Sequence, residues 1–152
     1  MRLFALLFAF MAWSSQVEAE VFDPNFELSQ IKGVSVYLID DAKGACWTNL
    51  KEVREYAEEK LHMRGVKGVD GQTSLTMEQN YLFSIAVHSR RLLKDGSGHC
   101  WGSIRVILST VTMINGNRHK ALIGEYSAGS LLKTNQNRRV IEAVSEFLAE
   151  FK

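Results

Sequence analysis

The chain is poor in proline, cysteine and net charge: its 152 residues include one proline and two cysteines, and the formal net charge is +1. Such balanced charge argues against broad electrostatic attraction to nucleic acid or to an anionic membrane. No apolar run reaches the roughly 20 residues that a membrane-spanning helix needs. Zinc-type spacings such as H-E-x-x-H or H-x-H are also missing, so we expect no metal site and no cofactor.

The N-terminus is the most informative segment. A single basic residue, Arg2, precedes an apolar run over residues 3–13, and a polar stretch then ends in Val17-Glu18-Ala19. A short apolar run followed by small residues at −3 and −1 of a cleavage site is typical of a secretory signal peptide. We therefore predict a signal peptide over residues 1–19, with a buried N-terminal helix as the alternative.

Cleavage there would leave residues 20–152, which is the length of one small domain. No cysteine lies near the predicted cut, so the usual lipid-attachment box is missing. These features predict an exported protein without a membrane anchor, located in the periplasm or secreted. Residues 20–32 have no periodicity and contain the only proline, so we expect an extended N-terminal arm there.

Two cysteines, Cys46 and Cys100, lie in glycine-containing segments, and each is followed by tryptophan. In an exported chain an even number of cysteines favours a disulfide. A bond between them would close a long loop, worth about 4 kcal/mol in the chain-entropy model. Two free thiols, or a redox or metal role, are the alternatives; redox pairs are usually written Cys-x-x-Cys.

Alternating and turn-bounded apolar residues predict the strands, including a short one after the first helix. The expected strands are Gly33–Asp40, Val66–Val69, Tyr81–Ser89, Trp101–Ile114 and His119–Ala128. In the fourth of these the apolar residues change from even to odd positions, which indicates a bulge or a strand covered on both faces. Asn115-Gly116-Asn117 is a good hairpin turn, and Gly129-Ser130 is expected to end the last strand.

Two segments show helical periodicity. The first spans Asn49–Arg64, with Asn49 and Glu52 as a capping box and Gly65 just after its end. The second begins near Thr134 or Asn135 and runs to the C-terminus. Each has one apolar stripe, so each is expected to bury one face against a sheet.

The predicted order is therefore β-α-β-β-β-β-α. The fold class is α+β: a two-layer sandwich in which both helices lie on one face of a mixed, mostly antiparallel sheet of four or five strands. This element order resembles that of several small bacterial envelope domains, such as the amino-terminal domain of TolB. The resemblance is one of topology and carries no shared motif, so it implies a fold and leaves the function open.

The sheet face away from the helices is expected to be partly apolar, because Tyr37, Ile39, Leu82 and Ala86 alternate with the predicted core residues. A sheet with one solvated face normally has a more polar pattern on that face. Two explanations remain open: the N-terminal arm covers this face, or it binds another surface, including that of a second copy in a homodimer.

The function predicted from these features is a non-catalytic binding or accessory module, acting on a protein or envelope component that the sequence does not identify. The alternative is a small secreted hydrolase whose site forms only in the fold. Its candidate residues are His88, His99, Asp41, Glu125 and Ser127. A pocket that holds a histidine and a carboxylate with a shifted pKa would favour that alternative.

Overall fold

The computed structural model describes residues 18–22, 26–69, 80–93 and 98–151. The turn expected at Asp70–Thr73 and most of the glycine-rich turn before Cys100 lie outside these ranges. The elements in chain order are β1 (Glu18–Phe22), the 3-10 helix η1 (Leu28–Gln30), β2 (Gly33–Ala42), α1 (Leu50–Met63), β3 (Asn80–Arg91), β4 (Cys100–Ile114), β5 (Asn117–Leu132) and α3 (Asn137–Ala149).

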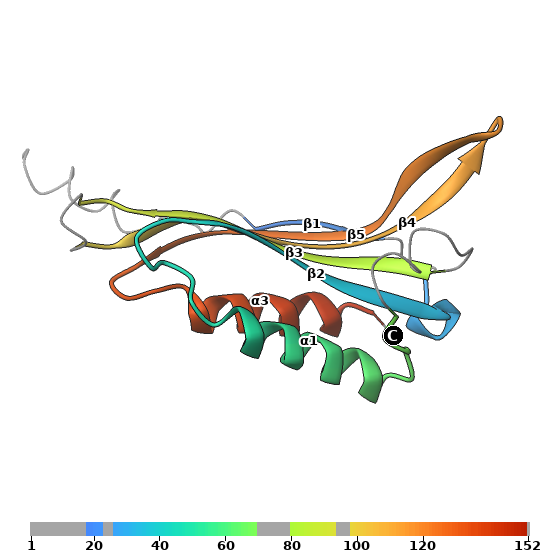
Figure 1. Cartoon of the computed structure of the whole chain (residues 1–152), viewed down its shortest axis with the longest axis horizontal. Coiled ribbons are helices and arrows are strands. Elements are labelled where there is room, and N and C mark those ends of the chain that lie inside the picture. Colours follow the sequence, from blue (N-terminus) through green and yellow to red (C-terminus); the bar gives the residue numbers. More distant parts are fainter. Residues whose placement is uncertain (1–17, 23–25, 70–79, 94–97, 152) are drawn as a thin grey trace, which may run out of the picture.

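One five-stranded sheet carries the fold, in the order β1-β5-β4-β3-β2. The β2–β3 pair is parallel and is connected through α1, whereas all other pairs are antiparallel. Both helices cover the same face of the sheet, and within the described residues no helix lies on the other face (Figure 1). The α+β class and the two layers, with both helices on one face of a mixed, mostly antiparallel sheet, are therefore confirmed.

Two segments near the sheet edges differ from the sequence prediction. Residues 66–69 form only an isolated bridge, Val34 to Gly68, so the predicted short strand is wrong. The fifth strand is instead β1, which pairs with β5 from Glu18 to Phe22. Cleavage before Glu20 would remove the first two residues of β1 and leave its last three.

Helix α1 ends in the predicted way, but its start differs. Gly65 has φ +81°, and Val66 N–H donates to the carbonyl of Leu61, so a glycine-based C-cap closes the helix. At the start, the Asn49 side chain caps no backbone group and donates from Nδ2 to Glu52 Oε2 at 2.9 Å. The predicted capping box is therefore replaced by a bond between the two side chains.

The core lies between the helices and the inner face of the sheet. Phe147 on α3 stacks edge-on against Phe83 on β3 with ring centroids 5.6 Å apart, and against Phe151 at 5.1 Å. Helix α3 begins two or three residues later than predicted, with Gln136 as its N-cap, and it ends at Ala149 rather than at the C-terminus; its apolar stripe is largely buried. None of the helices in the described part of the chain is long and apolar enough to cross a membrane.

The predicted disulfide is present. Cys46 and Cys100 are joined across 54 residues of sequence, and both are completely buried. The bond ties the loop before α1 to the first residue of β4. That loop also contacts the start of α3, since Gln136 N–H donates to the Cys46 carbonyl at 2.7 Å.

Strands β4 and β5 form a long hairpin with a bulge. The register shifts between Leu108 and Ser109, where Ile123 is the extra residue on β5. Asn115 and Gly116 both have positive φ, 52° and 79°, as a tight two-residue hairpin turn requires. The predicted end of β5 at Gly129-Ser130 is wrong, because both residues pair with β4 and the strand continues to Leu132.

Candidate functional site

The outer face, on the side of the sheet away from the helices, holds all four residues predicted for an interaction surface. Ile39 on β2 lies opposite Ala86 on β3, and Tyr37 shares their face. Tyr37 is 40 % exposed and Ile39 is 49 % exposed, whereas Leu82 is half-buried and Ala86 is only 6 % exposed. Ala86 is therefore buried between larger neighbours and adds little exposed area to this face.

Further apolar residues extend this face toward the hairpin. The register aligns Leu82 with Ser109 and Leu122, and it aligns Ser84 with Ile107. Leu122 and Met113 are about half exposed. The sequence feature that indicates these outward-facing residues is the change to odd apolar positions in β4. Odd positions face outward throughout this strand, because the extra residue of the bulge lies on β5.

A charged pair lies in the middle of the outer face. Arg105 on β4 donates from Nε and Nη2 to Glu125 Oε1, at 2.9 and 2.6 Å. Ser127 is the cross-strand neighbour of Arg105. Glu125 and Ser127, two of the candidate residues for hydrolysis, therefore belong to this polar cluster in the middle of the outer face.

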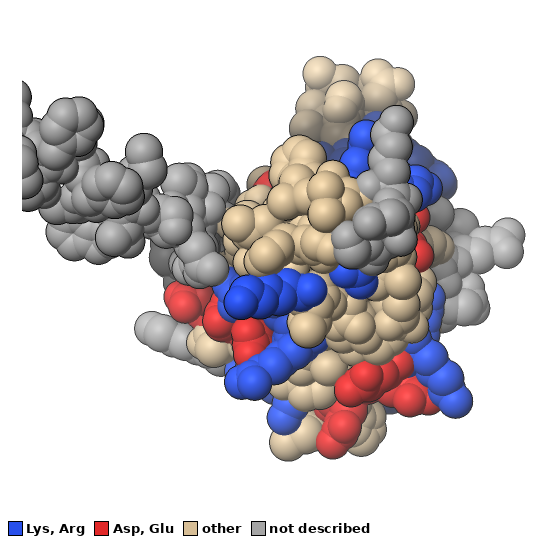
Figure 2. Space-filling view, turned by 90° about the vertical axis from the view of Figure 1, so that its left-hand side faces the viewer, with Lys and Arg blue, Asp and Glu red and all other residues tan. Residues whose placement is uncertain are grey.

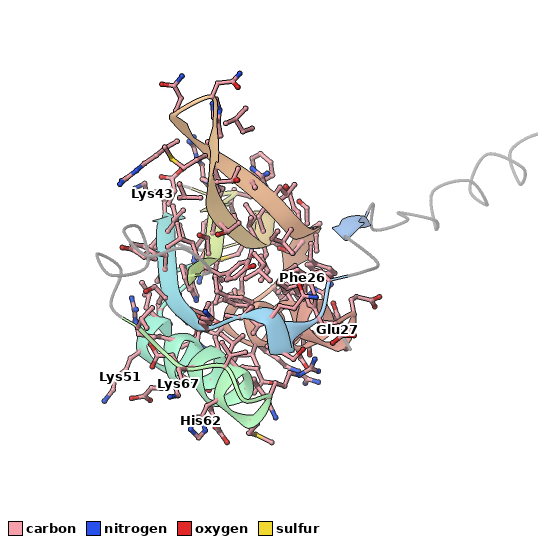
Figure 3. All side chains as sticks on the ribbon, turned by 90° about the vertical axis from the view of Figure 1, so that its right-hand side faces the viewer. Phe26, Glu27, Lys43, Lys51, His62 and Lys67 are labelled. Carbon is pink, nitrogen blue, oxygen red and sulfur yellow. A yellow bond between two sulfur atoms is a disulfide. The ribbon has the colours of Figure 1, made fainter. Side chains whose placement is uncertain are left out.

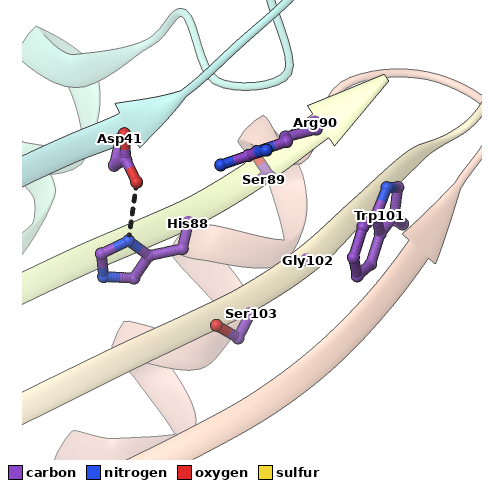
Figure 4. A pocket seen from close by; sticks show the side chains of 7 residues that line it. All are labelled: Asp41, His88, Ser89, Arg90, Trp101, Gly102 and Ser103. Atoms are coloured by element: carbon purple, nitrogen blue, oxygen red, sulfur yellow. Dashed lines mark hydrogen bonds and ion pairs between the residues drawn. The ribbon is translucent and has the colours of Figure 1, made fainter. Parts of the chain in front are cut away.

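A shallow pocket of about 410 Å³ lies at the end of the outer face where β2 and β3 finish and β4 begins. Its lining residues are Asp41, His88, Ser89, Arg90, Trp101, Gly102 and Ser103. His88 Nδ1 donates to Asp41 Oδ2 at 3.2 Å, as the dashed line in Figure 4 shows. Trp101 stands on the other side of the pocket, with its side chain 51 % exposed.

The carboxylate of Asp41 is stabilised in its charged form. The hydrogen bond from His88 lowers the pKa of Asp41, and the nearby Lys43 ammonium, 3.6 Å away, lowers this pKa further. Both side chains of the Asp41–His88 pair are about half exposed to solvent. The pair is therefore an open surface interaction rather than a buried catalytic dyad.

Gly102 sets how closely β4 approaches β3 at the floor of this pocket. A Cβ atom placed there would lie 2.0 Å from the carbonyl oxygen of His88 and 2.6 Å from Cα of Ser89. Any larger residue would push the two strands apart. The shape of the pocket therefore depends on Gly102, whose importance the sequence alone did not indicate.

The hydrolase candidates are only partly brought together. Asp41 and His88 meet, and Ser103 is the cross-strand neighbour of His88, but in the described part of the chain no side-chain hydrogen bond joins Ser103 to His88. His99 lies outside the pocket lining, where its carbonyl accepts from Leu92 N–H. Among the residues the structure describes, no group of three or more His, Cys, Asp or Glu could hold a metal ion.

Charge is mixed around this end of the molecule. Figure 2 shows basic and acidic side chains interspersed with uncharged surface, without a large area of one sign. This pattern agrees with the balanced composition. Electrostatic attraction of a long polyanion therefore has no broad surface to act on at this end.

Fold and surface together define a small two-layer α+β module with an uncovered, partly apolar sheet face. No family model matches the chain, and no curated protein matches its sequence. Its fold is similar to that of PelC from Paraburkholderia phytofirmans, solved as a dodecamer: TM-score 0.51 and 13 % identity, covering 89 % of this chain and 96 % of that one. A single-substitution variant of the PelC dodecamer in another crystal form gives TM-score 0.55 and 13 % identity, covering 88 % and 96 %. At this identity the likeness establishes a shared fold.

Proposed function

We propose that this protein is an exported, non-catalytic module that binds a protein surface through the outer face of its sheet. The observation that carries the proposal is the exposure of Tyr37 and Ile39 beside the apolar Leu82 and Ile107 on a face that no helix covers. Burial of exposed apolar side chains is the main favourable term in most protein association.

Export is supported by the signal-peptide features of residues 1–19 and by the buried disulfide. Disulfides persist in oxidising compartments such as the periplasm and the extracellular space, and they are rare in the cytoplasm. A periplasmic or secreted location is therefore part of the proposal. N-terminal sequencing of the exported protein should find Glu20 as the first residue.

The proposed binding partner is a protein of the cell envelope or a further copy of this chain. Support for assembly comes from the similar fold of PelC, which was solved as a dodecamer. The outer face has the features of a contact surface: an apolar centre, with an Arg–Glu pair and a rim of charged residues.

Self-association and partner capture of the mature chain (residues 20–152) test this function. Ile39→Asp places a charge among the apolar residues of the outer face, on the edge strand β2, and Met63→Asp is a matched control because Met63 is 67 % exposed at the end of α1. We expect Ile39→Asp to abolish self-association in sedimentation velocity, or to abolish capture of an envelope protein, while Met63→Asp changes neither. Equal behaviour of the wild type and both variants would contradict the proposal.

The second candidate is a hydrolase, favoured by one observation: the Asp41–His88 hydrogen bond in a pocket that also contains Ser103. Against it stands the solvent exposure of both side chains, since catalytic groups gain most from a site that excludes water. Hydrolysis of a panel of simple ester and amide substrates that is lost in both His88→Ala and Ser103→Ala, with folding intact, would establish this function instead.

A further inference from the structure

The β4–β5 hairpin extends beyond the rest of the sheet. The last pairing between β3 and β4 joins Tyr81 to Thr110, so among the described residues, residues 111–120 form a ribbon of two strands. This ribbon rises on the side away from the helices (Figures 1 and 3). A two-stranded ribbon is marginally stable on its own in water, so it gains from packing against another surface.

The outward side of the ribbon combines apolar and basic residues. Val111 lies opposite Lys120 and Met113 lies opposite Arg118, on the side that continues the outer face. Met113 is 56 % exposed, and Leu122 at the base of the ribbon is 48 % exposed. Arg118 and Lys120 are exposed, and within the described residues neither forms an ion pair.

The opposite end of the same face has complementary features. Trp101, the second residue of β4, lies there with Leu131 as its cross-strand neighbour, and these residues are 51 % and 62 % exposed. Beside them lies the carboxylate of Asp41 in the shallow pocket. One strand, β4, thus connects an exposed aromatic pocket at its start to an exposed apolar and basic ribbon at its end.

We propose that a second copy of this chain packs on the outer face about a two-fold axis, with the ribbon of each copy lying over the Trp101 pocket of the other. This inference rests on the proposed function, in which the outer face is a binding surface. A two-fold axis that lies between the two faces and runs across the strands brings each end of the face onto the other end of its partner, so the interface is complementary to itself and closed. Two sheets packed face to face in this way are a common arrangement.

The centre and the ends make different contributions to this contact. In the centre, Ile107 of each copy meets its counterpart, and the Arg105–Glu125 pair of each copy lies near that of the other, while Ile39 lies at the β2 edge of the contact. At the ends, Met113 and Leu122 contact Trp101 and Leu131, where a thioether against an aromatic ring is a favourable contact.

Charge argues against only one of the two orientations that a second copy could take on this face. The ribbon contains basic residues and no acidic ones. At the other end of the face, Lys43 and Arg90 lie beside the carboxylate of Asp41, so this end is not acidic as a whole and the apolar residues supply most of the affinity. A parallel arrangement would instead place two basic ribbons together, which like-charge repulsion disfavours.

Cysteine cross-linking between copies tests the arrangement directly, because both native cysteines are already paired. We expect a mixture of the Met113→Cys and Trp101→Cys variants to form a covalent heterodimer under mild oxidation. Each variant alone should form far less dimer, since the two-fold axis holds identical positions apart. Dimerisation of Met113→Cys alone with as high a yield as the mixture would overturn the inverted arrangement.

A second measurement needs no cross-link. In sedimentation velocity, we expect Met113→Lys to weaken self-association of the mature chain at least about tenfold, and Met63→Lys, the matched control, to leave it unchanged. A wild-type chain that stays monomeric up to high concentration, yet captures an envelope protein in an Ile39-dependent way, would refute the second copy and leave the proposed function standing. A wild-type chain that neither self-associates nor captures an envelope protein would refute both the two-fold arrangement and the proposed function.

Discussion

The two faces of one sheet differ in what covers them. On β2, Val34 and Val36 point toward the helices and are 2 % and 7 % exposed, whereas Tyr37 and Ile39 are 40 % and 49 % exposed on the other side. Both faces are apolar in sequence. The inner face is needed for folding because α1 and α3 bury it, while the outer face carries apolar residues that the described fold does not use. That difference is the basis of the binding function proposed for the outer face.

The comparison also separates two kinds of polar interaction. Between the inner layer and α3, the hydroxyl of buried Tyr126 donates to Glu146 and accepts from Arg139. On the outer face, Asp41 and His88 form a hydrogen bond between side chains that are about half exposed. The first network should contribute more to stability than the second, because solvent screens exposed pairs.

The largest expected effect comes from removing a ring from the inner layer. Phe147→Ala should reduce the free energy of unfolding by about 3–5 kcal/mol, because it leaves a cavity among Phe83 and Phe151. Ile39→Ala on the outer face is the control and should change it by less than about 0.5 kcal/mol in the monomer. Urea unfolding at low protein concentration measures both; a loss under about 1 kcal/mol for Phe147→Ala would mean that α3 does not dock as described.

The second largest effect on stability is expected from removing the disulfide. Replacing Cys46 and Cys100 with alanine should cost about 2–4 kcal/mol, chiefly because the unfolded chain regains freedom over a long loop. Thermal unfolding of the oxidised and reduced wild type provides an independent comparison. Titration of two free thiols in the exported protein, under denaturing and non-reducing conditions, would contradict the bond.

A smaller effect is expected at the contact between β5 and α3. Tyr126→Phe removes one hydroxyl and should cost about 0.5–1.5 kcal/mol, since Arg139 still pairs with Glu146. Burial tends to raise the pKa of Glu146, but the hydrogen bonds from Tyr126 and Arg139 outweigh it and lower this pKa below 4.5.

A carboxylate with a lowered pKa contributes stability above its ordinary pKa, and that contribution is lost as the pH falls through the lowered value. Tyr126→Phe should therefore flatten the acid side of the stability profile below about pH 4.5. An unchanged slope in acid denaturation, with stability at neutral pH equal to that of the wild type, would show that this network is not formed.

The smallest effect is expected at the outer-face pocket. His88→Ala should move the pKa of Asp41 up toward its ordinary 3.8, because the largest cause of its lowering is removed. Stability at neutral pH should change by less than about 0.5 kcal/mol. An NMR titration of the Asp41 carboxyl measures the shift, and an unchanged pKa would mean that the pair does not form in solution.

Much of this architecture could be predicted from local patterns. Periodicity located α1 to within a residue at each end, and the Asn115-Gly116 turn and the bulge region were correct because both leave short-range signals. Gly129-Ser130 was misread as a strand end, since the glycine is tolerated where the ladder with β4 continues. A strand was wrongly predicted over residues 66–69, because apolar content alone does not show whether a segment pairs with a neighbouring strand.

The candidate site was harder to predict. Asp41 and His88 were both named, but 47 residues separate them, and only the parallel register of β2 and β3 places them opposite each other. Met113 and Leu122 were not expected on the binding surface, since nothing in the sequence indicates that the hairpin outgrows its sheet.

The amino-acid sequence by itself determined the helices, the pairing of its two cysteines and the inward faces of β2 and β3, because these depend on period and on the number of partners available. Only the tertiary structure decided which distant strands lie side by side, where the hairpin leaves the sheet, and that one apolar face remains open. Those features depend on register and chain crossing, and such long-range contacts have no local signature in the sequence.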